Sequence, residues 1–244
     1  MRPLFVLVIN LLSVTGVQSQ SKQIWAEYML NYPFANSFNV ELAMTYSTAL
    51  EQPKWRSFDL QLTPEYAISE HVDVMAGVFG GKTLQNESIT SSEIREMIGA
   101  RFHFTPHRRI LTRLLLRLEQ RNMLEDGVES WEHSTRSRLR AETLTPLNKK
   151  TMFEGDKLLY LIFDAETFIV LDQDVEERFA NRFRLRSGLG YRINYNFRVE
   201  FVYTLQESKN TIEGDFYTSD HIFRFRLKHY LNAGRQSKVG GMGN

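Results

Sequence analysis

Apolar and polar residues alternate with a period of two along almost the whole chain after residue 20. Between Phe197 and Leu205, for example, every second side chain is apolar, and Arg198 and Glu200 lie between them. A period of two places all the apolar side chains on one face of a β-strand. The pattern therefore predicts an all-β protein in which every strand has one apolar and one polar face.

Eleven segments of the chain carry this alternation, and most are about ten residues long or longer. They are centred on residues 24–32, 38–46, 58–62, 72–78, 98–104, 114–118, 139–141, 159–165, 183–189, 197–205 and 223–227. Strands in soluble sheets usually have five or six residues, whereas a strand that crosses a membrane needs about 9–11. The segment lengths therefore favour transmembrane strands.

The connections between these segments are predicted to alternate in length. Tight turns with Asn or Pro are expected at Phe34–Asn36, Ser69–Glu70, Thr105–His107 and Asn194–Asn196, and an intermediate connection at Thr145–Lys150. Longer polar connections are expected at Leu84–Ser92, Leu124–Glu129, Leu171–Glu177 and Ser208–Thr218. Short turns at one end and long loops at the other are typical of outer-membrane barrels.

The first residues have the three parts of a secretory signal peptide. A positive start at Arg2 precedes a mostly apolar run, Leu4–Val17, and a cleavage site after Ser19. A buried N-terminal helix or strand is the alternative. No later stretch has 18 consecutive apolar residues, so no transmembrane helix is predicted. We expect a signal peptide at residues 1–19, a barrel at 20–232 and a flexible C-terminal tail at 233–244.

These features together predict an antiparallel up-and-down transmembrane β-barrel in the bacterial outer membrane, in contact with outer-membrane lipid. Closing the sheet removes the strand edges, whose backbone groups lipid cannot satisfy. Bacterial barrels have an even number of strands, so twelve are expected, with ten as the alternative. Glu96 falls on an apolar face, and we expect it above the membrane or turned inward by a β-bulge.

Aromatic residues collect near the predicted tight turns, where a membrane interface would hold them. They are Tyr32, Phe34, Phe38, Tyr66, Phe102, Phe104, Tyr191, Tyr195 and Phe197. The alternative is that aromatic residues are simply frequent in strands.

The polar face of the predicted barrel carries rows of arginine with interspersed carboxylates, which closure would direct into the lumen. The candidate lumen residues are Arg113, Arg117, Glu119, Arg136, Arg138, Arg140, Glu142, Arg182, Arg184, Arg186, Glu200, Arg224 and Arg226, with Lys228 beside them. One interpretation is a network of ion pairs that maintains the barrel shape. The other is an electropositive pore that attracts small anions.

The overall composition excludes several classes of protein. The chain has no cysteine, so it has no disulfide, no thiolate metal site and no cysteine lipid anchor. Its 30 basic and 29 acidic residues give a net charge of +1, which argues against nucleic-acid binding. No histidine pair has metal-ligand spacing and no glycine pair has a phosphate-loop pattern, so neither a metal nor a cofactor is predicted.

Catalysis is not predicted either. Ser187 and His133 fall on apolar faces, as in barrels that hydrolyse lipids at their outer wall, but they lie on segments that are not neighbours.

The stretch from Asn181 to Tyr203 contains an R-x-R-x-G-L-G-Y hairpin, and it resembles a bacterial family known as domain of unknown function 2490. Trp25, Glu93-Ile-Arg95 and Arg117-Leu-Glu119 fall in places comparable with the family pattern. The resemblance covers nearly all of the chain after the signal peptide. It implies an outer-membrane β-barrel of unassigned activity, of the kind common in Bacteroidetes-type bacteria, and supplies no catalytic residues.

Three functions remain open from the sequence. The first is an integral outer-membrane barrel with a structural or narrow-channel role. The second is an anion-selective porin or transporter for acidic small solutes or oligosaccharides. The third is a soluble exported, lipocalin-like ligand binder, in which the apolar face would point inward. The sequence predicts no oligomeric state.

Overall fold

The computed structural model describes residues 21–35, 37–50, 54–85, 88–172, 182–209 and 216–231. The predicted signal peptide and C-terminal tail lie outside these residues. The described residues form eleven β-strands, and none of them forms a helix long and apolar enough to cross a membrane. The all-β prediction is confirmed.

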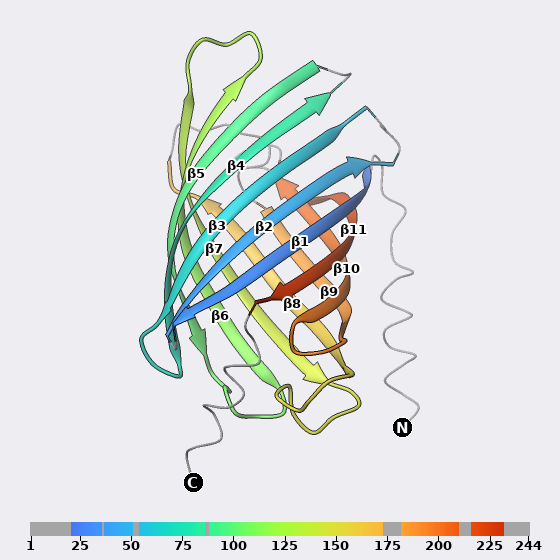
Figure 1. Ribbon diagram of the computed structural model, residues 1–244. Helices are drawn as coiled ribbons and strands as arrows, with labels where there is room; N and C mark the ends of the chain where they lie inside the picture. The colour runs from blue at the N-terminus through green and yellow to red at the C-terminus, as the bar shows by residue number, and fades with distance from the viewer. Residues whose placement is uncertain are drawn as a thin grey trace.

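The strands form one closed barrel in which each strand pairs with its neighbours in the chain (Figure 1). They have 11 to 16 residues each. The strands are β1 (Ser21–Ala35), β2 (Phe38–Ala49), β3 (Arg56–Ala67), β4 (Val72–Gln85), β5 (Ser88–His103), β6 (Leu111–Glu125), β7 (Glu132–Pro146), β8 (Leu158–Val170), β9 (Arg182–Arg192), β10 (Phe197–Lys209) and β11 (Phe216–Tyr230).

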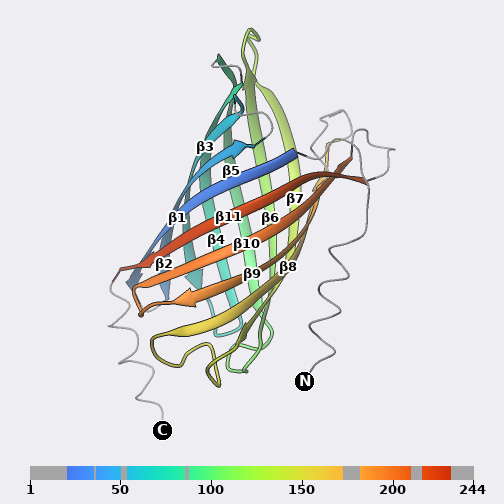
Figure 2. The same cartoon turned by 90° about the vertical axis from the view of Figure 1, so that its right-hand side faces the viewer.

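The barrel closes between β1 and β11, which lie side by side in Figures 1 and 2 and pair in parallel. This seam runs from Ser21 opposite Asp220 to Asn31 opposite Tyr230. The other strand pairs are antiparallel. The predicted strand number of twelve is therefore wrong for the described residues, which close with eleven. A parallel ladder also pairs the backbone N–H and C=O groups of both edges, so closure does not require an even number.

Because the strand number is odd, the first and last strands point the same way. The turn end of the barrel holds the connections 36–37, 68–71, 104–110, 147–157 and 193–196, together with the end of β11. The loop end holds the connections 50–55, 86–87, 126–131, 171–181 and 210–215, together with the start of β1. The first strand thus enters from the loop end.

The predicted difference between short turns and long loops is only partly correct. Two residues separate β4 from β5, because both strands continue through the expected loop Leu84–Ser92 with a register shift near Thr83. The connection after β7 is longer than expected and runs from 147 to 157 at the turn end. Met152 in this connection is buried and packs against apolar side chains of the barrel interior.

The alternation predicted from the sequence appears as two distinct faces of the barrel wall. The outward side chains are mostly apolar and exposed, with Ile98 at 62%, Phe163 at 56% and Phe225 at 54%. The inward side chains are mostly polar or charged, and many of the arginines among them are buried. The barrel is therefore apolar outside and charged inside.

Candidate functional site

The thirteen charged residues singled out from the sequence all point to the interior of the barrel. Twelve of them line a single internal cavity, and Glu119 lies fully buried against Arg117 and Arg136. The cavity has a volume of about 1470 Å³. Its lining includes Trp55 at the loop end and Arg198 at the turn end, so it extends from one end of the barrel to the other.

Two buried carboxylates of the interior each contact three arginines. Glu119 on β6 accepts a hydrogen bond from Arg117 Nε at 2.7 Å and lies 2.6 Å from Arg136 Nη2 and 3.8 Å from Arg138 Nη1. Sharing one carboxylate among three guanidinium groups leaves positive charge uncompensated.

Glu166 on β8, two strands further around the barrel from Glu119, has the same arrangement. It pairs with Arg138 Nε, lies 3.1 Å from Arg186 Nη2 and 3.5 Å from Arg184 Nη1, and is 1% exposed. Arg138 contacts both Glu119 and Glu166, so it joins the two clusters.

The network continues toward the turn end through two further carboxylates. Asp164 accepts a hydrogen bond from Arg186 Nε at 2.5 Å and lies 3.6 Å from Arg140. Glu142 pairs with both Arg140 and Arg113. The connected network on β6–β9 therefore has seven arginines and four carboxylates, a formal charge of 7 − 4 = +3.

A second cluster spans the parallel seam. Arg226 on β11 donates from Nε to Glu27 on β1 at 2.5 Å and from Nη1 to Glu200 on β10 at 2.8 Å. Lys228 lies 2.9 Å from Glu200, and Arg224 Nη1 lies 3.6 Å from Glu27. These contacts link the first strand to the last two and so support closure of the barrel.

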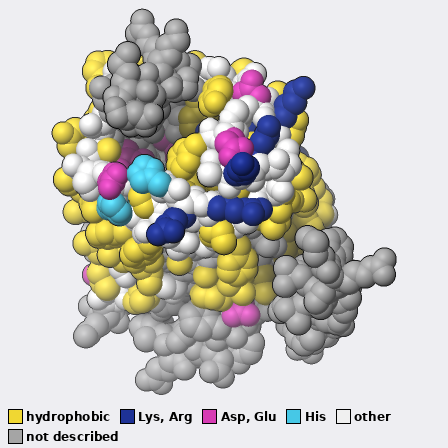
Figure 3. All heavy atoms as spheres, turned by 90° about the horizontal axis from the view of Figure 1, so that it is seen from below, with side chains coloured by type: hydrophobic (Ala, Val, Ile, Leu, Met, Phe, Trp, Pro, Cys, Tyr) yellow, Lys and Arg dark blue, Asp and Glu magenta, His cyan; other side chains and the backbone are white. Residues whose placement is uncertain are grey.

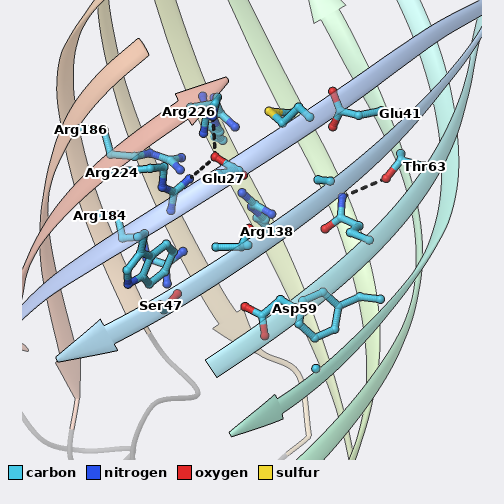
Figure 4. A pocket seen from close by; sticks show the side chains of 18 of the residues that line it. Glu27, Glu41, Ser47, Asp59, Thr63, Arg138, Arg184, Arg186, Arg224 and Arg226 are labelled. Atoms are coloured by element: carbon cyan, nitrogen blue, oxygen red, sulfur yellow. Dashed lines mark hydrogen bonds and ion pairs between the residues drawn. The ribbon is translucent and has the colours of Figure 1, made fainter. Parts of the chain in front are cut away.

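Charge is distributed unevenly around the cavity. Sixteen Arg and Lys side chains line it, and all of them come from β5–β11. The lining residues from β2–β4 are mostly small or neutral, with Glu41, Asp59 and Glu65 as their carboxylates. Figure 4 shows Arg184, Arg186 and Arg224 on one side of the pocket and Glu41 and Asp59 on the other. Long arginines fill one half of the lumen, whereas short side chains leave space in the other.

The turn end of the lumen contains a small apolar cluster formed by the connection after β7. Met152 from this connection is buried and packs with Leu158, Tyr160, Ile162 and Val202, all of which point inward. Arg192 donates hydrogen bonds from Nη2 to the Met152 carbonyl oxygen at 2.6 Å and from Nη1 to the Gly155 carbonyl oxygen at 3.3 Å. Residues 147–157 therefore narrow this end of the barrel.

The R-x-R-x-G-L-G-Y motif has a physical explanation in this interior. Its two arginines and two glycines alternate along the inward face of β9. A Cβ atom at Gly188 or Gly190 would overlap, respectively, the backbone of β10 or the ring of Tyr160. The ring lies over Gly190, and its hydroxyl donates to Glu200 Oε1 at 2.6 Å. Gly190 thus makes room for Tyr160, and Gly188 allows the close approach of β10.

The outer wall has a polar interruption on β5 and β6. Glu96 on β5 points outward in a regular ladder opposite Val78 and Gln120, so the alternative in which a β-bulge turns it inward is wrong. Thr135 donates a hydrogen bond to Gln120 Oε1 at 2.9 Å.

The two residues considered for lipid hydrolysis lie apart. His133 Nδ1 is 2.6 Å from Asn122 Oδ1, whereas Ser187 pairs with residues of β8 and β10. His133 is on β7 and Ser187 on β9, with β8 between them.

Charged and histidine side chains gather at the turn end, as Figure 3 shows in the view from below, with hydrophobic side chains around them. Glu70 in the turn after β3 lies 3.0 Å from Nε2 of His107 in the turn after β5. This hydrogen bond holds the pKa of the Glu70 carboxyl below its usual range. In the described part of the chain, no group of His, Asp or Glu is arranged to hold a metal ion.

Fold and interior together define a closed β-barrel with an apolar outer wall and an arginine-rich, ion-paired lumen. Residues 22–217 match the family described as protein of unknown function (DUF2490), and the chain belongs to that family. The family resemblance seen in the sequence is thereby confirmed. No curated protein matches the chain.

Several interior residues were not among the lumen residues predicted from the sequence. Among the ion-pair partners they include Glu27, Glu93, Arg95, Arg121, Asp164 and Glu166. Each of these residues falls on the inward face in the period-two alternation, so the alternation alone indicates that all of them point into the lumen. Their pairing did not follow from the sequence, because Glu27 and Arg226 meet only after the barrel closes.

Proposed function

We propose that this protein is an integral outer-membrane β-barrel, in contact with outer-membrane lipid, whose lumen forms a narrow and largely ion-paired passage. The observation that carries the proposal is the apolar outer wall. Monomeric soluble proteins rarely expose contiguous apolar patches of more than a few hundred Å², because each exposed Å² costs about 25 cal/mol. Here large exposed apolar side chains occur on strands all around the barrel, including Leu62, Leu116 and Phe201.

Two further features support a membrane location. The strands are long enough to cross a hydrocarbon layer, for which about 9–11 residues are needed. Exposed aromatic rings near the turn end, among them Phe34, Tyr66 and Phe104, match the expected position of an interfacial belt. The soluble lipocalin-like alternative needs its apolar face inside, which is opposite to the inward rows described above.

Membrane extraction and gel mobility test this proposal. We expect the protein to remain in the membrane fraction after high-salt and carbonate washes and to require detergent for release. We also expect an unheated sample to migrate differently from a boiled one, because a closed barrel resists detergent until it is heated. Release by salt alone would contradict the proposal.

An anion-selective channel is the second candidate function, and the +3 charge of the network on β6–β9 favours it. Charged rings at a constriction set the selectivity of a pore. The cavity reaches both ends of the barrel, and its sixteen basic side chains exceed its ten carboxylates. Small anions are therefore the solutes that the lumen would favour.

Charge reversal in the lumen tests the selectivity. Replacing Arg138 and Arg184 with Glu changes the network charge by four, from +3 to −1, and we expect the reversal potential in a planar bilayer under a salt gradient to change sign. Replacing both with Gln should weaken anion preference without reversing it. The matched control is Arg108→Glu with Arg109→Glu, an equal change in charge in the exposed turn after β5. Equal effects of the two charge-reversed pairs would exclude a lumen origin of selectivity.

A further inference from the structure

Trp25 on β1 lines the cavity beside two guanidinium groups from other strands. The Cζ atom of Arg224 on β11 lies 4.5 Å from the centre of the indole ring, and that of Arg184 on β9 lies 5.8 Å away. Both arginines also line the cavity. A guanidinium within about 6 Å of an aromatic ring is held there by cation–π attraction. Three side chains from distant parts of the sequence thus meet at one position of the lumen wall.

A chain of hydrogen bonds orients this group. Trp25 Nε1 donates to Gln23 Oε1 at 2.8 Å, and Gln23 Nε2 donates to Asp220 Oδ1 at 2.9 Å. Gln206 Nε2 donates to Asp220 Oδ2 at 2.6 Å, and Arg184 Nε donates to Gln206 Oε1 at 2.7 Å. Asp220 therefore fixes both amides, which in turn fix the indole and one edge of the Arg184 guanidinium.

Both arginines retain hydrogen-bond donors that an anion could use. The Nε of Arg224 has no hydrogen-bond partner within the residues that the structure describes, although the side chain is only 7% exposed. Its nearest carboxylate, Glu27, lies 3.6 Å away and accepts a closer bond from Arg226. Arg184 lies 3.5 Å from Glu166, which is shared with two other arginines.

We propose that Arg184 and Arg224, beside Trp25, form a binding site for the oxyanion group of a small solute, a carboxylate, sulfate or phosphate. The planar guanidinium presents paired N–H donors that match two oxygens of such a group. The group would complete the hydrogen bonding of Arg224 and add negative charge where the network has an excess of positive charge. Figure 4 shows Arg184 and Arg224 together on one side of the pocket.

This inference extends the proposed lumen function, and it names the position at which an anion would pause during passage. The site lies on β1, β9 and β11, beside the parallel seam, whereas the apolar cluster with Met152 lies at the turn end. An anion that enters from the loop end therefore reaches the site before it reaches that narrowing.

Trp25 itself can report binding. The chain has three tryptophans, so the variant Trp55→Phe with Trp131→Phe leaves Trp25 as the only one. The purified full-length barrel in detergent is titrated with iodide, caesium and acrylamide, which are anionic, cationic and neutral quenchers. We expect iodide to quench Trp25 fluorescence more strongly, relative to acrylamide, than caesium does. Sulfate should protect against iodide, and chloride at equal ionic strength should protect less.

Single-residue variants test whether Arg184 and Arg224 are responsible for the protection by sulfate. Arg184→Gln and Arg224→Gln are each expected to weaken protection by sulfate about tenfold, the loss expected for one charge-assisted contact. Arg108→Gln in the exposed turn is the matched control and should leave protection unchanged. Glucuronate and phosphate are compared with sulfate to distinguish a sugar-borne carboxylate from a free inorganic anion, and glucose is the neutral control. The heat-dependent gel shift verifies that each variant is folded.

Three results would overturn the inference: equal quenching by iodide and caesium, unchanged protection in both folded arginine variants, or protection by glucose as strong as by glucuronate. The two kinds of experiment distinguish failure of the anion site from failure of the proposed membrane location. A protein released by salt that still binds sulfate through these arginines would refute only the membrane location. A detergent-requiring barrel without anion protection would refute only the site.

Discussion

Replacing Glu166 with Gln is expected to destabilise the barrel by about 3 kcal/mol or more, as removal of one partner from a buried ion pair typically does. Glu166 is 1% exposed and contacts Arg138, Arg184 and Arg186. The variant raises the network charge from +3 to +4 and leaves three guanidinium groups around a neutral amide. The repulsion acts inside a barrel interior in which water screens it only weakly.

The temperature of the heat-dependent gel shift measures this loss, and urea unfolding followed by tryptophan fluorescence gives the free energy. Glu132→Gln is the matched control, because Glu132 is exposed at the start of β7. We expect that control to unfold like the unchanged protein. If both variants unfolded at the same temperature, the ion-pair network would not be what stabilises the interior.

Gly190→Val is expected to destabilise the barrel by a comparable amount, about 3 kcal/mol, because overpacking and the loss of a hydrogen bond to a charged group add together. The new Cβ would overlap the Tyr160 ring, so the ring must move and its hydrogen bond to Glu200 must break. The apolar cluster with Met152 would be disturbed at the same time, since Tyr160 belongs to it.

Gly80→Val provides the control for this prediction. Gly80 lies on the outward face of β4, and a Cβ there meets no atom within 4 Å. We expect this variant to unfold like the unchanged protein. Tyr160→Leu in the Gly190→Val background should restore part of the lost stability by freeing the space above residue 190. No recovery in the double variant would argue against the steric explanation.

Both experiments probe the interior, which the sequence described in outline. The period-two alternation predicted an all-β chain, eleven segments and the inward orientation of the arginine rows, because the parity of a strand is a local property. The expected number of twelve strands is wrong for the described residues, since the even-number regularity is a property of known barrels and not a physical requirement. The parallel pairing of β1 with β11 satisfies the same backbone groups.

The lengths of the connections were less predictable than the strands. The connection between β4 and β5, residues 86–87, is shorter than expected, and the connection between β7 and β8, residues 147–157, is longer. Met152, Tyr160 and Val202 explain the second case, because they pack together only once β8 and β10 are neighbours of the same lumen. A local pattern of Asn, Pro and polar residues carries no information about such packing.

The sequence by itself determined the class of fold and the side of the wall to which each residue belongs. Only the tertiary structure decided which side chains meet, such as Glu27 with Arg226 across the seam and Arg184 with Trp25 across the two strands between β9 and β1. The physical reason is that face orientation depends on neighbours two residues away, whereas ion pairing depends on strand register and closure. Register and closure bring together residues almost 200 positions apart in the chain, as in the contact between Glu27 and Arg226.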